Sequence, residues 1–95
     1  MIIIGGDMKV NPEFRAEAVQ AFVKMAKASQ AEEGCITYVF TADLEAEDIF
    51  HLFEVWENAE TLAAHGQTPH MAEFRAEIGK YRTESNIKRY QAEPA

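Results

Sequence analysis

Two histidines, His65 and His70, stand five residues apart on either side of the segment 66–69. Histidine is the side chain whose ordinary pKa lies closest to neutrality, so each ring can accept or donate a proton at little cost. Both lie where helix ends are expected, and a chain turn there can direct a side chain into a cavity. The pair indicates proton-transfer catalysis; the alternative is that either ring caps a helix or lies on the surface.

The same pair is a weak metal site. Two imidazoles need a third ligand, and neither an H-E-x-x-H motif nor a 2-His-1-carboxylate spacing is present. The single cysteine, Cys35, excludes an internal disulfide, a CxxC redox pair and a four-cysteine zinc site, and we expect it to be a buried structural thiol. Motifs for phosphate, dinucleotide, haem attachment or a nucleophilic serine are also missing. We therefore expect no metal and no bound cofactor.

An acid and several aromatic residues accompany the histidines. Glu54 and Trp56 share one face of an expected strand, because residues two apart along a strand point the same way. A buried carboxylate needs a partner, so Glu54 either positions a ligand or a histidine, or forms an ion pair. The candidate ion-pair partners are Arg75, Arg82 and Arg89. Aromatic side chains around this acid would suit a flat aromatic ligand. The expected ligand contacts are Tyr38, Phe53, Glu54, Trp56 and Phe74.

The elements that must position these residues alternate between strands and helices. Runs rich in β-branched and aromatic residues predict strands over 2–10, 35–42 and 49–57, with a last strand over 83–91. Helices are predicted between the first two strands, over 59–65, and from Pro69 onward. This β-α-β-β-α-β order is the ferredoxin-like arrangement, so the predicted fold class is α+β.

Capping residues and apolar spacing predict the helix bounds. Asn11-Pro12, Asn58 and Thr68-Pro69 are typical helix starts, and Gly34 and Gly66 are typical stops. Spacings of three and four indicate the apolar stripe of each long helix. The stripes are Phe14, Ala18, Ala21, Met25 and Ala28 in the first helix, and Met71, Phe74, Ile78 and Tyr81 in the last. Gly5-Gly6 indicates a bulge or a close backbone approach.

The strand over 49–57 is apolar on both faces. Phe50, Leu52 and Trp56 share one face, and Ile49, Phe53 and Val55 share the other. A sheet with only one covered face should alternate apolar with polar residues. No element remains to cover the second face, so we expect a homodimer whose sheets pack face to face as a dimeric α/β barrel. The alternative is that some of these side chains lie exposed at an edge.

Length and charge exclude several classes of partner. A chain of 95 residues fits a single domain over 1–95, and a chain this short buries only about 60–65% of its unfolded surface, which favours self-association. A net charge of −7 repels phosphate backbones and anionic lipids, so we expect no nucleic acid and no membrane insertion. No apolar run approaches the roughly 20 residues of a membrane span, and the start lacks a basic segment. We expect a cytoplasmic protein.

Four sequence blocks resemble a known family. The blocks are EEGCITY (32–38), FEVWE (53–57), LAAH (62–65) and QTPHM (67–71). They resemble the antibiotic biosynthesis monooxygenase (ABM) family, and within it the small quinol monooxygenases. The resemblance implies a dimeric α+β barrel that oxygenates an electron-rich aromatic with O2, without metal or flavin. The characteristic Trp and His positions of the family match Trp56, His65 and His70.

The predicted function is therefore that of a cofactor-independent monooxygenase, with His65 as the preferred base and His70 as the second choice. Two alternatives stay open. A related branch isomerises a phosphorylated dione from quorum-signal catabolism; that reaction needs no O2 and needs a phosphate site. Arg75, Lys80 and Arg82 are the candidates for that site. The other alternative is a non-catalytic dimer that binds a small aromatic ligand. Haem degradation is not expected, because the first strand carries Gly5, Gly6 and Asp7 where that branch has an asparagine.

Overall fold

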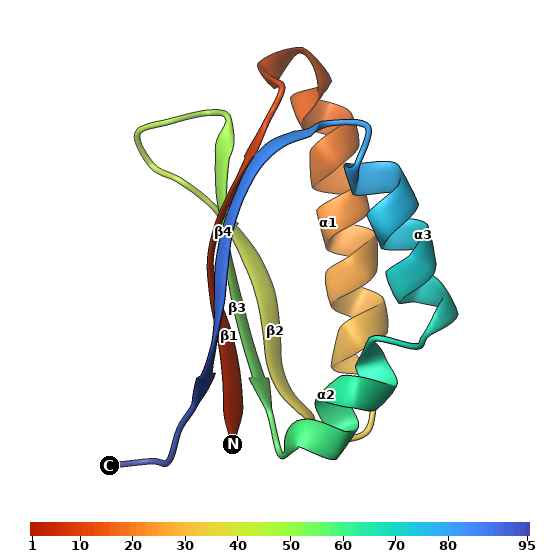
Figure 1. Ribbon diagram of the computed structural model, residues 1–95. Helices are drawn as coiled ribbons and strands as arrows, with labels where there is room; N and C mark the ends of the chain where they lie inside the picture. The colour runs from red at the N-terminus through yellow and green to blue at the C-terminus, as the bar shows by residue number, and fades with distance from the viewer.

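One antiparallel sheet of four strands, covered by helices on one side, organises residues 1–95 of this computed structural model (Figure 1). The strands are β1 (Ile2–Val10), β2 (Cys35–Ala42), β3 (Ile49–Trp56) and β4 (Arg82–Gln91), in the order β2-β3-β1-β4. A 3-10 turn, η1 (Pro12–Phe14), precedes α1 (Arg15–Gln30), and α2 (Ala59–His65) and α3 (Pro69–Ile78) follow β3. The predicted ferredoxin-like α+β fold is confirmed. None of the helices is long and apolar enough to cross a membrane.

The predicted helix starts are confirmed at atomic level. The side-chain oxygens of Asn11, Asn58 and Thr68 accept hydrogen bonds from the backbone N–H of the second or third residue that follows, at 3.0, 2.9 and 3.2 Å. The first helix, however, ends at Gln30 and not at Gly34. Gly34 lies in the turn before β2 with φ +82°, a left-handed conformation that side chains other than glycine rarely adopt.

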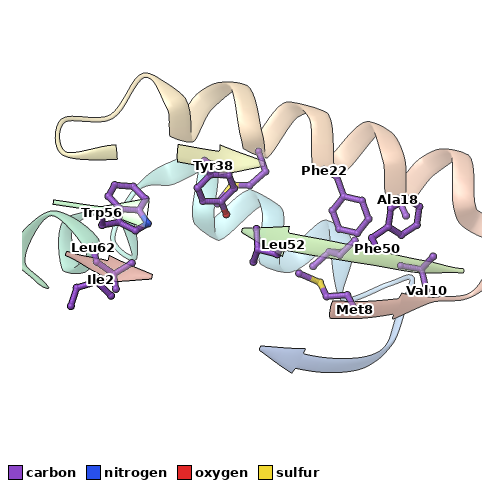
Figure 2. Close-up of a cluster of buried hydrophobic side chains, with 12 residues drawn as sticks. Ile2, Met8, Val10, Ala18, Phe22, Tyr38, Phe50, Leu52, Trp56 and Leu62 are labelled. Carbon is purple, nitrogen blue, oxygen red and sulfur yellow. The ribbon is translucent and has the colours of Figure 1, made fainter. Parts of the chain in front are cut away.

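The apolar stripe of α1 is rotated relative to the predicted one. Its buried side chains are Ala18, Phe22, Met25 and Ser29, while Phe14 is exposed. The predicted and the observed buried faces both have apolar residues spaced three and four apart. The alanines of α1 are small enough to suit either face, so they do not decide between the two. Phe22 decides between them, because its ring stacks on Phe40 at 4.5 Å and packs on Phe50 at 4.9 Å. Figure 2 shows Phe22 and Phe50 among the core side chains between α1 and the sheet.

The two faces of the sheet have different surroundings. Phe50, Leu52 and Trp56 face the helices and are buried. The opposite face carries a group of apolar side chains on neighbouring strands, which we call the outer-face patch: Ile3, Val39, Phe53, Val55 and Tyr90. Figure 1 shows no helix on that side of the sheet. Phe53 is 44% exposed there. Cross-strand pairing places Ile3 opposite both Val55 and Tyr90.

The expected close backbone approach is found at Gly6. Its φ is +150°, and a side chain there would stand 1.9 Å from the carbonyl oxygen of Asn86 on β4. The bulge lies elsewhere on β1: the register with β4 shifts between Lys9 and Val10. Gly6 therefore allows β1 and β4 to pair closely in the middle of the sheet.

Candidate functional site

The turn between α2 and α3 brings the two predicted histidines together. His65 is the last residue of α2 and His70 the second residue of α3. Thr68 organises the turn: its hydroxyl donates to the carbonyl oxygen of His65 at 2.8 Å and accepts from the N–H of Met71 at 3.2 Å. The two imidazole rings consequently lie 6.0 Å apart, centroid to centroid.

Glu32 joins the two histidines through a single oxygen atom. Its Oε2 lies 2.6 Å from Nδ1 of His65 and 2.8 Å from Nε2 of His70. An ionised carboxylate can only accept hydrogen bonds, so both rings donate to it. Glu32 lies in the turn between α1 and β2, where its own N–H donates to the carbonyl oxygen of Ser29 at 3.0 Å. The fold thus brings an acid to the histidines from a distant part of the sequence.

The ring of His65 is enclosed by aromatic side chains. Only 1% of the residue is exposed, and its ring centroid lies 4.6 Å from that of Trp56 and 5.4 Å from that of Tyr38. Its second nitrogen, Nε2, is buried and has no hydrogen-bond partner. Buried polar atoms are rarely left unpaired, so this nitrogen marks a position where a ligand group could bind.

Trp56 connects this cluster to Glu54. The indole Nε1–H donates to Oε1 of Glu54 at 2.9 Å. Burial raises the pKa of Glu54 to about 7, the hydrogen bond from Trp56 opposes that rise, and the negative charge of Glu32 adds to it. The alternative prediction of an ion pair with Arg75, Arg82 or Arg89 is wrong, because the carboxyl group is turned into the core and these arginines are exposed.

Tyr38 and Cys35 carry protonated groups at the edge of the cluster. Burial, with a contribution from the charge of Glu54, raises the pKa of the Tyr38 phenol. Burial also raises the pKa of the Cys35 thiol, and the charges of Glu32 and Glu54 add to that rise. A thiol that stays protonated is a poor nucleophile. The expectation of a buried thiol is wrong in one respect, because Cys35 stands at the start of β2 and is only partly buried there.

His70 and Phe74 reach the surface in a groove of about 500 Å³ between α1 and α3. The other lining residues are Glu17, Gln20, Ala21, Lys24, Met25, Glu73, Ala76, Glu77 and Tyr81. Tyr38, Glu54, Trp56 and His65 are buried and do not line this groove. The structure therefore brings together six of the seven predicted site residues as a buried cluster and an adjoining groove, with His70 between them. The seventh, Phe53, lies apart on the outer face.

Glu32, His65 and His70 have the residue types of a metal site, and their ligand atoms lie within 4.8 Å of one another. The spacings within this group are nevertheless those of hydrogen bonds. Ligands held about 2.0–2.2 Å from one tetrahedral zinc ion stand about 3.3–3.6 Å apart, whereas the carboxylate oxygen lies 2.6 and 2.8 Å from the two nitrogens. The geometry is that of a hydrogen-bonded triad.

The sequence-based prediction of site residues missed Glu32. The acid belongs to the EEGCITY block, but nothing in the block distinguishes it from its neighbour Glu33. The distinction arises from the fold, which directs Glu32 to the histidines and leaves Glu33 exposed.

Comparison with known proteins finds relatives that match most of this chain. An uncharacterised Synechocystis protein is 37% identical over 73 residues; the match covers 77% of this chain and spans only half the length of that relative. YcnE of Bacillus subtilis, whose name suggests monooxygenase activity, is 30% identical over 76 residues, which is 80% of each chain.

Solved structures agree with these relatives. A Deinococcus radiodurans protein named for antibiotic biosynthesis monooxygenases superposes with a TM-score of 0.93 at 27% identity, covering 100% of this chain and 95% of that one. A conserved Bacteroides thetaiotaomicron protein of unknown function has a TM-score of 0.88 at 32% identity, with 94% of each chain covered. The antibiotic biosynthesis monooxygenase profile itself matches residues 1–77. The chain therefore belongs to the antibiotic biosynthesis monooxygenase family.

Proposed function

We propose that this protein is a cofactor-independent monooxygenase that oxidises an electron-rich aromatic compound, such as a quinol, with O2. The observation that carries the proposal is the pair of histidines bridged by Glu32, in which His65 is buried against Trp56 and its Nε2 has no hydrogen-bond partner. Such a site offers a proton acceptor next to flat aromatic surfaces, which is what a phenolic substrate requires.

The proposed reaction begins with proton transfer from a phenolic O–H of the quinol to a histidine, with His65 as the preferred base. The phenolate is a much better one-electron donor than the phenol, so it passes an electron to O2, and the radical pair recombines to a hydroperoxide. Loss of water then yields a hydroxyquinone. Overall, the quinol gives up four electrons to O2; one oxygen atom enters the product and the other leaves as water.

The protein contributes a base, an orientation and exclusion of water. Trp56 and Tyr38 pack against the ring of His65, and Phe74 lines the groove together with His70. Glu54, with a pKa of about 7, can hold or release a proton near neutral pH. General-base help of this kind contributes roughly 10²–10⁴ in rate.

The proposal includes a homodimer formed through the sheet. The outer-face patch is bounded by polar residues on the other half of the same face, Asp7, His51 and Asn86. An apolar group of this kind on an otherwise polar face is typical of a protein interface. A second copy packed there would complete the barrel that the family resemblance implies. A cytoplasmic location also stays a prediction.

Oxygen uptake with a reduced naphthoquinone tests the activity. We expect uptake above the buffer blank, with one hydroxyquinone formed per O2, and a loss of about 10²–10⁴ in rate in His65→Ala. His51→Ala is the matched control, because His51 is exposed on the outer face of the sheet and pairs with Asp43. Uptake equal to the blank, or unchanged in a His65→Ala/His70→Ala double variant, would contradict the proposal.

No observation in the structure favours the isomerase alternative. Lys80 pairs with Glu77 at 3.1 Å. The charged residues that line the groove at His70 are Glu17, Glu73 and Glu77 against Lys24, so the net negative charge repels a phosphate. Anaerobic turnover of a phosphorylated dione would nevertheless establish an isomerase. Saturable binding of the quinol with no product by mass spectrometry would instead establish a non-catalytic binding dimer.

A further inference from the structure

We infer that Glu32 is a positioning residue that fixes the tautomers of both histidines and thereby makes Nε2 of His65 the proton-accepting atom of the site. The inference deepens the proposed function, on which its kinetic part rests. It comes from one geometric fact: a single carboxylate oxygen faces a different nitrogen of each ring, Nδ1 of His65 and Nε2 of His70.

The bridge determines the tautomer of His65. At 2.6 Å, a lone pair on Nδ1 would face the lone pairs of an ionised carboxylate, which is repulsive, so Nδ1 carries the hydrogen. A neutral ring then has its only lone pair on Nε2. That atom is buried and unpartnered, and the ring to which it belongs packs on Trp56 and Tyr38. The lone pair is therefore kept in the interior, away from bulk solvent.

The same argument gives His70 the opposite tautomer. Its Nε2 lies 2.8 Å from the shared oxygen and donates, so the lone pair of a neutral ring is on Nδ1. Nδ1 makes no hydrogen bond within the chain and is not buried, and 23% of the His70 side chain is exposed in the groove. His70 thus presents its lone pair to solvent, while His65 presents its own to the interior.

The two histidine rings have different roles in this arrangement. When Nε2 of His65 accepts a proton, the ring becomes an imidazolium whose Nδ1–H already donates to the carboxylate, a charge-assisted contact that stabilises the new charge. The second hydrogen bond, from His70, holds the carboxylate in place. Loss of His70 should therefore reduce the rate less than loss of His65.

Nitrogen-15 NMR of the histidine side chains in the intact protein tests the tautomers without any substrate. At a pH where the rings are neutral, we expect the hydrogen on Nδ1 in His65 and on Nε2 in His70. In Glu32→Ala both rings should lose this preference. Glu32→Gln should keep it, because the amide oxygen can still accept from both rings. His51 is the internal reference, and Glu33→Gln is the matched control, since Glu33 is exposed.

Kinetics on the same variants separate positioning from simple packing. Glu32→Gln keeps the hydrogen-bond acceptor but removes the negative charge that would stabilise the imidazolium, so we expect kcat to fall about tenfold, less than in His65→Ala, with the tautomers unchanged. Glu33→Gln should leave kcat unchanged. A hydrogen on Nε2 of His65 in the unmodified protein, or unchanged tautomers in Glu32→Ala, would overturn the inference even if oxygen uptake is found. A protein with the expected tautomers and no oxygen uptake would instead refute only the proposed function.

Discussion

The indole N–H of Trp56 donates to Glu54 at 2.9 Å, although the two residues lie on the same strand and only two positions apart. Trp56 is fully buried, and the carboxyl group of Glu54 has this indole as its one hydrogen-bond donor within the chain. A single neutral donor compensates only part of the cost of burying a carboxylate. The raised pKa of Glu54, about 7, follows from this shortfall.

Glu54 should therefore make the protein less stable as the pH rises. Near pH 4.5 and below, the carboxyl group is protonated in both states. Between pH about 4.5 and about 7, the Glu54 carboxyl group is ionised in the unfolded chain but still protonated in the folded protein, which favours unfolding. Above pH about 7 the group is ionised in both states, and the free energy of unfolding falls no further on its account. The change from 4.5 to about 7 corresponds to roughly 3 kcal/mol. Relative to wild type, Glu54→Gln should gain about this free energy of unfolding between pH 4.5 and 8.

Urea unfolding across this pH range measures the effect. The exposed Glu57 gives the control, and Glu57→Gln should follow the wild-type curve. A difference between Glu54→Gln and wild type that does not vary with pH would show that Glu54 titrates normally in the folded protein.

Removing the indole donor should raise the pKa of Glu54 further. The hydrogen bond from Trp56 lowers this pKa against the effect of burial, and Trp56→Phe keeps a buried ring without the N–H. Carbon-13 NMR of the Glu54 carboxyl group follows the titration directly. Tyr38→Phe is the comparison variant, since it removes a buried hydroxyl but leaves the indole donor. An unshifted titration in Trp56→Phe would contradict the assigned contact.

The helix starts of this fold are readable from sequence because their chemistry is local. Asn11, Asn58 and Thr68 each satisfy a backbone N–H two or three residues away, so no distant part of the chain is needed to recognise them. The buried face of α1 is different. Its choice depends on Phe22 meeting Phe40 and Phe50, which belong to strands later in the sequence. Periodicity alone could not supply that information.

The candidate site also has residues that the sequence identifies and one that only the fold identifies. His65 and His70 stand out through residue type and spacing, and the strand period places Glu54 beside Trp56. Glu32 could not be chosen over Glu33, because the choice depends on which side chain of the α1–β2 turn points at the α2–α3 turn. The aromatic ring of Phe53 suits a ligand contact, but the strand period puts it on the face opposite Trp56, and the structure confirms that position on the outer face.

Gly6 should tolerate no side chain. Its φ of +150° is unfavourable for other residues, and a Cβ atom would stand 1.9 Å from a backbone oxygen of Asn86 that has no freedom to move aside. We expect Gly6→Ala to lower the thermal midpoint strongly or to prevent folding, a loss of a few kcal/mol typical of backbone strain. Circular dichroism melting measures it.

The neighbouring glycine is the matched control for this substitution. A Cβ atom on Gly5 meets only a backbone oxygen of Leu52, at the ordinary contact distance of 3.8 Å. Gly5→Ala should therefore change the unfolding free energy by no more than about 1 kcal/mol. If Gly5→Ala and Gly6→Ala destabilised the protein equally, the close approach of β1 and β4 would not explain why position 6 needs a glycine.

Phe53 should control self-association through the outer-face patch. It is 44% exposed and lies between Val39 and Gly5 on the neighbouring strands, so Phe53→Asp would place a charge in the middle of the proposed interface. We expect the unmodified chain to sediment as a dimer at micromolar concentration and Phe53→Asp to sediment as a folded monomer. Leu44→Asp is the control, because Leu44 is fully exposed in the β2–β3 connection and should leave the dimer intact. An unmodified chain that sediments as a stable monomer, or a dimer unaffected by Phe53→Asp, would move the interface away from this face.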